Sequence, residues 1–324
     1  MHTTRDFTYI AAADLTGAVN ALASDGAVAL GGGTDLLVEI EERLRTPDAL
    51  VDVRRIPELQ GISPRGDGSL RVGAAVTLAT LERDPMVRAS YGILAKACAA
   101  AASSALRNMG TLGGNLCQRP RCWYFRRGVR CYKSGGNVCP AVDGENQHLA
   151  ILGGGPCYAV HPSDPAVALT ALDATLELTH SGGTRRLAMA DFYGSPNADP
   201  TRETVLDSGE LIVSVELPPA AAGGVHYYDK ATQREAWDFA LVSLAAVRRR
   251  DGAVRLVLGG VAPRPWRVSE SVEEDVASGG LSDDDYFTLA DRALYDVNPL
   301  SQNGYKVEIA AALLRRGMRA LHAG

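Results

Sequence analysis

The apolar residues near the start of the chain follow first helical and then strand-like spacing. Within 14–24 the apolar positions share one helical face: Leu15, Ala18, Val19 and Leu22. Gly26 ends this predicted helix, and the apolar run 27–30 is typical of a buried strand. The glycine-rich segment 31–35 (GGGTD) and the helical stretch LLVEIEERL then lead to a second strand at 49–53. This order of elements predicts a small parallel sheet.

The middle of the chain combines regular elements with one long irregular segment. The pattern predicts, in order, a strand at 69–73, helices at 77–83 and 91–107, a second glycine-rich turn at 110–115, a strand at 157–161, a helix at 162–174, a hairpin around 181–183 and a strand at 210–218. Residues 117–157 show little periodicity and are dense in Cys, Gly, Arg and Asn. A bare loop of this length is uncommon in a compact domain, so we expect a bound cofactor to order it.

The pattern changes after the linker-like segment 220–224 (AAAGG). Three successive strands, HYYDKAT, FALVSLAAVRR and AVRLVLGGVA, precede predicted helices at 284–294 and 302–322. We therefore expect an α+β fold whose C-terminal domain, residues 225–324, is a three-stranded antiparallel sheet with helices.

The bulk composition narrows the class of protein. The chain has 324 residues, which suggests about two domains. Its 46% hydrophobic and 22% charged residues are ordinary for a globular protein, and its net charge of −5 argues against a nucleic-acid-binding surface. The N-terminal stretch lacks a signal-peptide pattern, and no apolar run reaches the ~18 residues that a membrane helix needs. We therefore expect a cytoplasmic protein.

Two glycine-rich loops suggest a phosphate-binding site. In GGGTD and in GTLGGN (110–115), small residues let backbone N–H groups point into one concave nest that holds anions, and Thr34 adds a hydroxyl donor. Either loop alone is equally typical of a tight turn, but two of them suit the diphosphate and long body of a dinucleotide such as FAD. The spacing is not GxGxxG, which disfavours NAD in a Rossmann fold.

Five of the six cysteines lie in or beside the irregular segment: Cys117, Cys122, Cys131, Cys139 and Cys157. Without a secretory signal a disulfide scaffold is unexpected, and four thiolates are the usual ligands of an iron–sulfur cluster. Zinc is one alternative, but structural zinc sites usually contain CxxC pairs, which this segment lacks. Free structural thiols are a second alternative. Cys98 lies in an alanine-rich helical stretch and is expected to be a core residue.

Five segments carry a family resemblance: ALGGGTDLL (29–37), RNMGTLGGNL (107–116), HPSDPAVALTALDA (161–174), YDKATQREAWDFALVSLAA (228–246) and PLSQNGYKVEIAAALLRR (299–316). Their order and spacing resemble the FAD-binding medium subunit of the xanthine dehydrogenase family of molybdenum hydroxylases. The resemblance implies a two-subdomain FAD-binding domain of the p-cresol methylhydroxylase type over residues 1–219. Its subdomains would span about 1–55 and 56–219, and the C-terminal domain would follow.

The cysteine segment resembles a branch of this family that has an additional [4Fe–4S] loop, here residues 117–157. That branch includes the 4-hydroxybenzoyl-CoA reductase β subunit and the medium subunit of periplasmic aldehyde oxidase. The short spacing between the second and third cysteines of the segment is closer to the aldehyde oxidase. The resemblance implies four cluster ligands and leaves Cys117 outside the set. These ligands are Cys122, Cys131, Cys139 and Cys157.

The resemblance also implies which residues contact the flavin. It assigns the pyrophosphate to Gly31, Gly32, Gly33, Thr34 and Asp35. It assigns further FAD contacts to Thr111, Gly114, Asn115, Ser163, Asp164 and Lys230. The alternative roles are a helix N-cap for Asp164 and a solvated strand position for Lys230. No catalytic residue is expected in this chain.

The implied function is electron transfer within an oxidoreductase. In the family a large subunit carries the molybdenum cofactor and a small subunit carries two [2Fe–2S] clusters. We expect electrons to pass from the small subunit through FAD in this chain to an external acceptor, such as a ferredoxin-like protein. Neither nucleic acid nor a membrane is expected as a partner, and the alternative to a cytoplasmic location is export with a signal-bearing partner. Two other functions stay open: a standalone FAD-dependent oxidoreductase of the same fold and a zinc-stapled interaction module.

Overall fold

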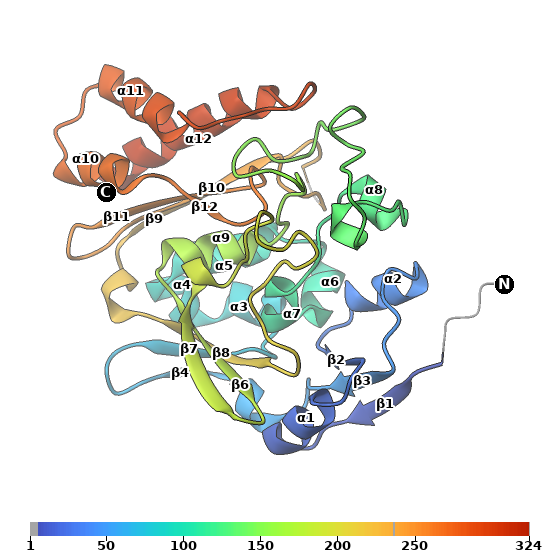
Figure 1. The fold of residues 1–324 in the computed structure, drawn as a ribbon. Helices are drawn as coiled ribbons and strands as arrows, with labels where there is room; N and C mark the ends of the chain where they lie inside the picture. The colour runs from blue at the N-terminus through green and yellow to red at the C-terminus, as the bar shows by residue number, and fades with distance from the viewer. Residues whose placement is uncertain (1–5, 236, 324) are drawn as a thin grey trace.

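The N-terminal part of the chain forms a small parallel sheet, as the pattern predicts. The structure is a computed structural model that describes residues 6–235 and 237–323 (Figure 1). The first sheet has the strand order β1-β3-β2. Its elements are β1 (Thr8–Ala11), α1 (Leu15–Leu22), β2 (Ala27–Leu30), α2 (Leu36–Glu41) and β3 (Ala49–Asp52). Strand β1 is absent from the prediction because it lies at the edge of the sheet and is mostly exposed, which leaves no apolar pattern.

The second sheet is antiparallel and has five strands in the order β4-β5-β8-β6-β7. These strands are β4 (Ile62–Pro64), β5 (Leu70–Gly73), β6 (Thr175–His180), β7 (Gly183–Ala188) and β8 (Leu211–Leu217). The helices of this region are α3 (Leu78–Arg83), α4 (Pro85–Ser90), α5 (Gly92–Ala100), α6 (Ser104–Met109), α7 (Leu112–Leu116) and α9 (Asp164–Ala171). Strand β8 joins β5 to β6, so segments more than a hundred residues apart share one sheet.

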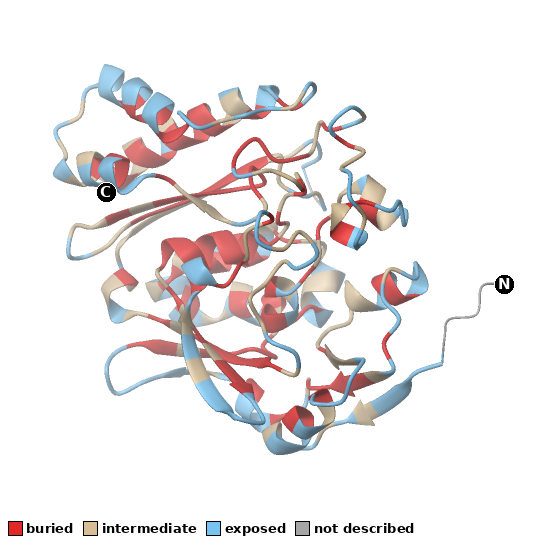
Figure 2. Cartoon of the chain, in the orientation of Figure 1, coloured by how far each residue is buried: buried red, intermediate tan, exposed pale blue. Residues whose placement is uncertain are grey.

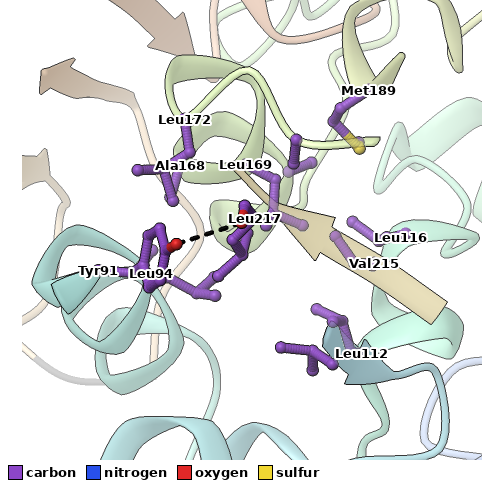
Figure 3. Close-up of a cluster of buried hydrophobic side chains, with 14 of the residues drawn as sticks. Tyr91, Leu94, Leu112, Leu116, Ala168, Leu169, Leu172, Met189, Val215 and Leu217 are labelled. Atoms are coloured by element: carbon purple, nitrogen blue, oxygen red, sulfur yellow. Dashed lines mark hydrogen bonds between the residues drawn. The ribbon is translucent and has the colours of Figure 1, made fainter. Parts of the chain in front are cut away.

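The largest hydrophobic core lies between this sheet and its helices (Figure 3). Leu94, Leu112 and Leu116 come from the helices, and Val215 and Leu217 come from the central strand β8. The hydroxyl of the buried Tyr91 donates to the carbonyl of Leu217 over 3.1 Å, which satisfies the one polar atom of this side chain. Figure 2 shows buried residues filling this zone, whereas the edge strand β7 is largely exposed.

The third sheet has the strand order β12-β11-β10-β9 and is antiparallel. Its strands are β9 (Val225–Ala231), β10 (Val242–Arg248), β11 (Val254–Gly259) and β12 (Trp266–Arg267), followed by α10 (Glu270–Ser278), α11 (Asp283–Ala293) and α12 (Tyr305–His322). Side chains of β10 alternate between two cores: Ala245 and Val247 join the middle core, and Leu244 and Ala246 join the core under α12. This sheet is therefore buried on both faces.

Three sequence expectations need correction. The predicted helix 91–107 is two helices, because the chain turns at Ala101 and Ala102, where Ala102 has φ +50°. The carbonyls of both turn residues accept hydrogen bonds from Arg107, so the break is compensated by side-chain donors. Residues 157–161 do not form a strand; they make only isolated backbone hydrogen bonds, such as His161 N to Ala262 O at 3.0 Å. The C-terminal sheet has a short fourth strand, β12, beyond the three expected.

The irregular cysteine segment contains little regular structure. Its elements are the four-residue helix α8 (Trp123–Arg126) and a 3-10 turn at Tyr132–Ser134. Within residues 6–235 and 237–323, no helix is both long enough and apolar enough to span a bilayer.

Candidate cofactor sites

The two glycine-rich loops pack directly against each other. The first follows strand β2, and the second leads into α7, where the Thr111 hydroxyl accepts a hydrogen bond from Gly114 N over 3.2 Å. A Cβ atom at Gly32 would lie only 1.9 Å from the carbonyl oxygen of Met109, and one at Gly31 would lie 2.6 Å from the Thr111 hydroxyl. Contact this close requires glycine at both positions.

A cavity of about 320 Å³ opens where these loops meet; we call it the loop cavity. The sequence-predicted flavin residues that line it are Gly31, Gly32, Gly33, Thr34, Asp35, Thr111, Gly114, Asn115 and Asp164. Ser163 lies beside it and donates from its hydroxyl to Asn115 Oδ1 over 2.6 Å. Of the predicted set, only Ser163 and Lys230 are not part of the lining. The folded chain therefore brings together residues that are far apart in the sequence.

Two further cavities adjoin the loop cavity. A cavity of about 290 Å³ at the ends of β10 and β11, here the strand-end cavity, shares Arg121, Pro162 and Asp164 with it. An apolar cavity of about 100 Å³ shares Gly31, Thr111, Gly114 and Cys117 with it on another side. The apolar cavity is otherwise lined largely by aliphatic side chains, among them Val53, Leu59, Leu211 and Ile212. Together these spaces form an elongated site that suits a ligand with an apolar end and an anionic middle.

Asp164 and Lys230 form a buried ion pair beside the elongated site. Ser163 is the N-cap of α9, since its hydroxyl accepts from Ala166 N over 3.1 Å, so the N-cap alternative for Asp164 is wrong. Lys230 is 7% exposed, which excludes the solvated alternative. Its Nζ donates to Asp164 Oδ2 over 2.8 Å, and the Tyr228 hydroxyl donates to Oδ1 over 2.9 Å. Burial raises the pKa of Asp164, although Lys230 and Tyr228 act in the opposite direction.

Changing Lys230 to methionine is expected to destabilise the apoprotein by about 3–5 kcal/mol, because Asp164 would stay buried without its counter-ion. The folded-state pKa of Asp164 would rise further, so stability would be kept at low pH and lost as pH increases. Urea unfolding at about pH 5 and pH 8 measures this difference. The double variant with Asp164→Asn should recover part of the loss, and equal losses at both pH values would contradict a buried unpaired carboxylate.

Asp35 faces the cysteine segment. Its carboxylate accepts hydrogen bonds from Arg119 N over 2.9 Å and from Arg126 Nη2 over 2.9 Å, and it also pairs with Arg121. Burial alone would raise the pKa of Asp35, but the two guanidinium groups outweigh it and lower the pKa. Asp35, which was predicted to contact the pyrophosphate, thus anchors the cysteine segment to the first glycine-rich loop, and sequence reasoning missed this role.

Four cysteines line one small cavity, here the cysteine cavity: Cys122, Cys131, Cys139 and Cys157. Cys117 lies elsewhere, in the wall of the loop cavity, and Cys98 is buried in α5. Within the described part of the chain, no group of three or more His, Cys, Asp or Glu side chains is arranged to hold a metal ion. Burial raises the pKa of Cys157 to about 11, although Lys133 acts against it. Metal binding at such thiols would release protons.

Glu203 was also missed by sequence reasoning. Its carboxylate pairs with Arg119 over 3.1 Å and with Lys133 over 3.1 Å, and both partners belong to the cysteine segment. Lys133 lines the cysteine cavity and is itself buried. Only the fold brings this acid to the segment, since some seventy residues separate the partners and no local pattern marks the pair.

A sequence model described as the FAD binding domain in molybdopterin dehydrogenase matches residues 5–220. The chain belongs to this family of FAD-binding oxidoreductase components, which confirms FAD as the predicted cofactor and confirms the predicted enzyme class.

Individual proteins that are similar to this chain support the same family assignment. The chain is 40% identical to the aldehyde oxidoreductase FAD-binding subunit PaoB of Escherichia coli (strain K12) over 92% of each chain. In quinoline 2-oxidoreductase from Pseudomonas putida 86, one chain matches with a TM-score of 0.76 and 27% identity, over 99% of both chains. In carbon monoxide dehydrogenase from Hydrogenophaga pseudoflava, one chain matches with a TM-score of 0.77 and 25% identity, again over 99% of both chains. The mixed α+β fold is therefore confirmed.

Proposed function

We propose that this chain is the electron-transfer subunit of a heteromeric molybdenum hydroxylase that acts on aldehydes. It would hold FAD and one [4Fe–4S] cluster. The observation that carries the proposal is a shared wall: Cys122, Tyr124 and Leu149 line both the strand-end cavity and the cysteine cavity. A flavin in the first space and a cluster in the second would be neighbours, as electron exchange between them requires.

The elongated site fits the parts of FAD. The glycine-rich loops that line the loop cavity offer backbone N–H groups to the diphosphate. The apolar cavity of about 100 Å³ suits the adenine, and the strand-end cavity of about 290 Å³ suits the isoalloxazine. Bound FAD supplies both one-electron and two-electron redox chemistry. The chain itself binds and orients the cofactor.

The donor set favours a cluster over zinc. Structural zinc sites usually contain CxxC pairs, and the cysteine segment contains none. An iron–sulfur cluster takes four thiolates, and four cysteines of this segment line one cavity. The proposed ligands are Cys122, Cys131, Cys139 and Cys157.

The complex would contain two other chains. We infer a large subunit with the molybdenum cofactor and a small subunit with [2Fe–2S] clusters, and the likeness to the Escherichia coli aldehyde oxidoreductase subunit supports this and the aldehyde substrate. Electrons would enter FAD from the small subunit and leave to a ferredoxin-like acceptor through the [4Fe–4S] cluster. The proposal includes a cytoplasmic location, with export together with a signal-bearing partner as the alternative. It also includes an FAD-binding domain that ends at residue 219 and a C-terminal domain that begins at residue 225.

The test is an absorption spectrum of the anaerobically purified protein with iron, sulfide and zinc analysis. Flavin bands near ~450 nm, with about four irons and four sulfides per chain, are expected. One zinc without sulfide would overturn the cluster and leave the FAD site, and a folded protein with neither flavin nor iron would overturn the proposal. Co-purification of a large and a small subunit separates this proposal from a standalone flavoprotein.

A further inference from the structure

Lys306 is a fully buried lysine whose amino group bonds to three backbone carbonyls. Its side chain is 0% exposed at the start of α12. Its Nζ donates to the carbonyls of His148 over 3.0 Å, Leu149 over 3.0 Å and Gly260 over 2.8 Å. Among the ion pairs of the described residues, none involves Lys306. The three carbonyls satisfy its three N–H groups but carry no net charge to neutralise it.

The three carbonyl acceptors place Lys306 behind a wall common to both proposed redox sites. His148, Leu149 and Gly260 all line the strand-end cavity, and Leu149 also lines the cysteine cavity. Asn303 strengthens the same wall, because its Nδ2 donates to Leu149 O over 3.2 Å and to Ala150 O over 3.1 Å. The amino group of Lys306 is therefore bonded directly to the backbone of residues that line the two spaces.

Packing alone does not explain a charge at this position. Burying an unpaired ammonium group costs free energy that an apolar side chain of similar length would avoid. The cost is visible in the pKa of Lys306, which burial lowers to about 7. The same low-dielectric surroundings strengthen the interaction of this charge with any nearby anion. The charge on Lys306 would therefore most strongly stabilise a nearby group that gains negative charge during turnover.

We propose that Lys306 stabilises the reduced forms of the cofactors in the two adjoining cavities and thereby raises their reduction potentials. The inference rests on the proposed function. Reduction of an iron–sulfur cluster adds one electron and one negative charge, and two-electron reduction of a flavin with uptake of one proton also adds one negative charge. Net charge near a cluster and charge near the flavin ring are established means of setting such potentials. Lys306 is not among the residues that line the two cavities, so it would act electrostatically and not by direct contact.

The test compares three substitutions in the purified holoprotein. Lys306→Met removes the charge and the donors, Lys306→Gln removes the charge but keeps donors, and Lys306→Arg keeps the charge. Redox titration, with the cluster followed by electron paramagnetic resonance and the flavin by absorption, gives the midpoint potentials. Lys96→Met, which removes an exposed lysine of α5, is the matched control.

The Met and Gln variants are expected to shift at least one midpoint potential downwards by a similar amount, of order tenfold in the one-electron equilibrium constant, or about 59 mV. The Arg variant and the Lys96→Met control should stay close to the unmodified protein. Unchanged midpoint potentials in a Met or Gln variant that retains FAD and iron would overturn the inference. Loss of both cofactors from both of these variants would also overturn it, because Lys306 would then have a purely structural role. An unmodified protein without flavin or iron would instead overturn the proposed function.

Discussion

Replacing Cys139 by serine is expected to remove the iron and sulfide from the purified protein while FAD stays bound. Cys139 lines the cysteine cavity with the three other proposed ligands and lines none of the three spaces proposed for the dinucleotide. A serine hydroxyl is a poor substitute for the thiolate that iron–sulfur clusters require. Iron content should fall from about four atoms per chain to less than about one. Iron, sulfide and flavin analyses of the same preparation measure the effect.

Cys117→Ser provides the matched control within the same segment. Its thiol lies in the loop cavity, away from the other four, so iron content should not change. The opposite pattern, with iron lost from Cys117→Ser and kept in Cys139→Ser, would show that the ligand assignment is wrong. The Cys139 variant also tests the exit route for electrons: if it still reduces a ferredoxin-like acceptor while FAD is bound, the cluster is not the point of exchange.

Replacing Gly32 by alanine is expected to weaken FAD binding by at least ~10³-fold, or about 4 kcal/mol. The new Cβ would lie 1.9 Å from the carbonyl oxygen of Met109, so the two glycine-rich loops would have to separate. The backbone N–H groups proposed to hold the diphosphate would then no longer converge. Titration of the apoprotein with FAD, followed by flavin fluorescence, measures the change.

Gly66→Ala is the control for the general effect of adding a methyl group. A Cβ at Gly66 meets no atom within 4 Å, so FAD affinity and stability should stay near those of the unmodified chain. Normal FAD affinity in the Gly32 variant would mean that the loops do not form the diphosphate site. A variant that unfolds entirely can be distinguished from one that only loses FAD by circular dichroism of the apoprotein.

Regular elements with a strong apolar period were predictable. The β2–α2–β3 unit, the hairpin β6–β7 and helices α9, α11 and α12 lie close to their predicted positions, because each has a local signal of its own. Helices α11 and α12 are amphipathic, β2 is a short apolar run, and α9 begins at a Ser-Asp-Pro sequence. The break between α5 and α6 was not predictable. Alanine favours helix at every position there, and the turn depends on Arg107, whose side chain donates to the freed carbonyls.

The candidate site also has features that the sequence predicts and features that it does not. The glycine-rich loops and the crowded cysteines are visible as residue types at short spacing, so the sequence alone indicates a nucleotide and a redox metal. The same residue types do not reveal that Asp35 bonds to Arg119 and Arg126, or that Glu203 pairs with Lys133. Each of these contacts joins segments separated by about seventy to ninety residues, which no periodicity can register.

The sequence by itself thus determined the class of protein, most strands of its three sheets and the chemical groups available for cofactors. Tertiary structure brought into one cavity the four cysteines that the family resemblance had singled out, and it placed Cys117 in the wall of another. It also brought Lys306 to the carbonyls of His148 and Gly260, which are distant from it in the sequence. The physical reason is that hydrophobic periodicity reports on structure over only a few neighbouring residues. Burial, charge pairing and cavity shape arise only when segments distant in the sequence pack together.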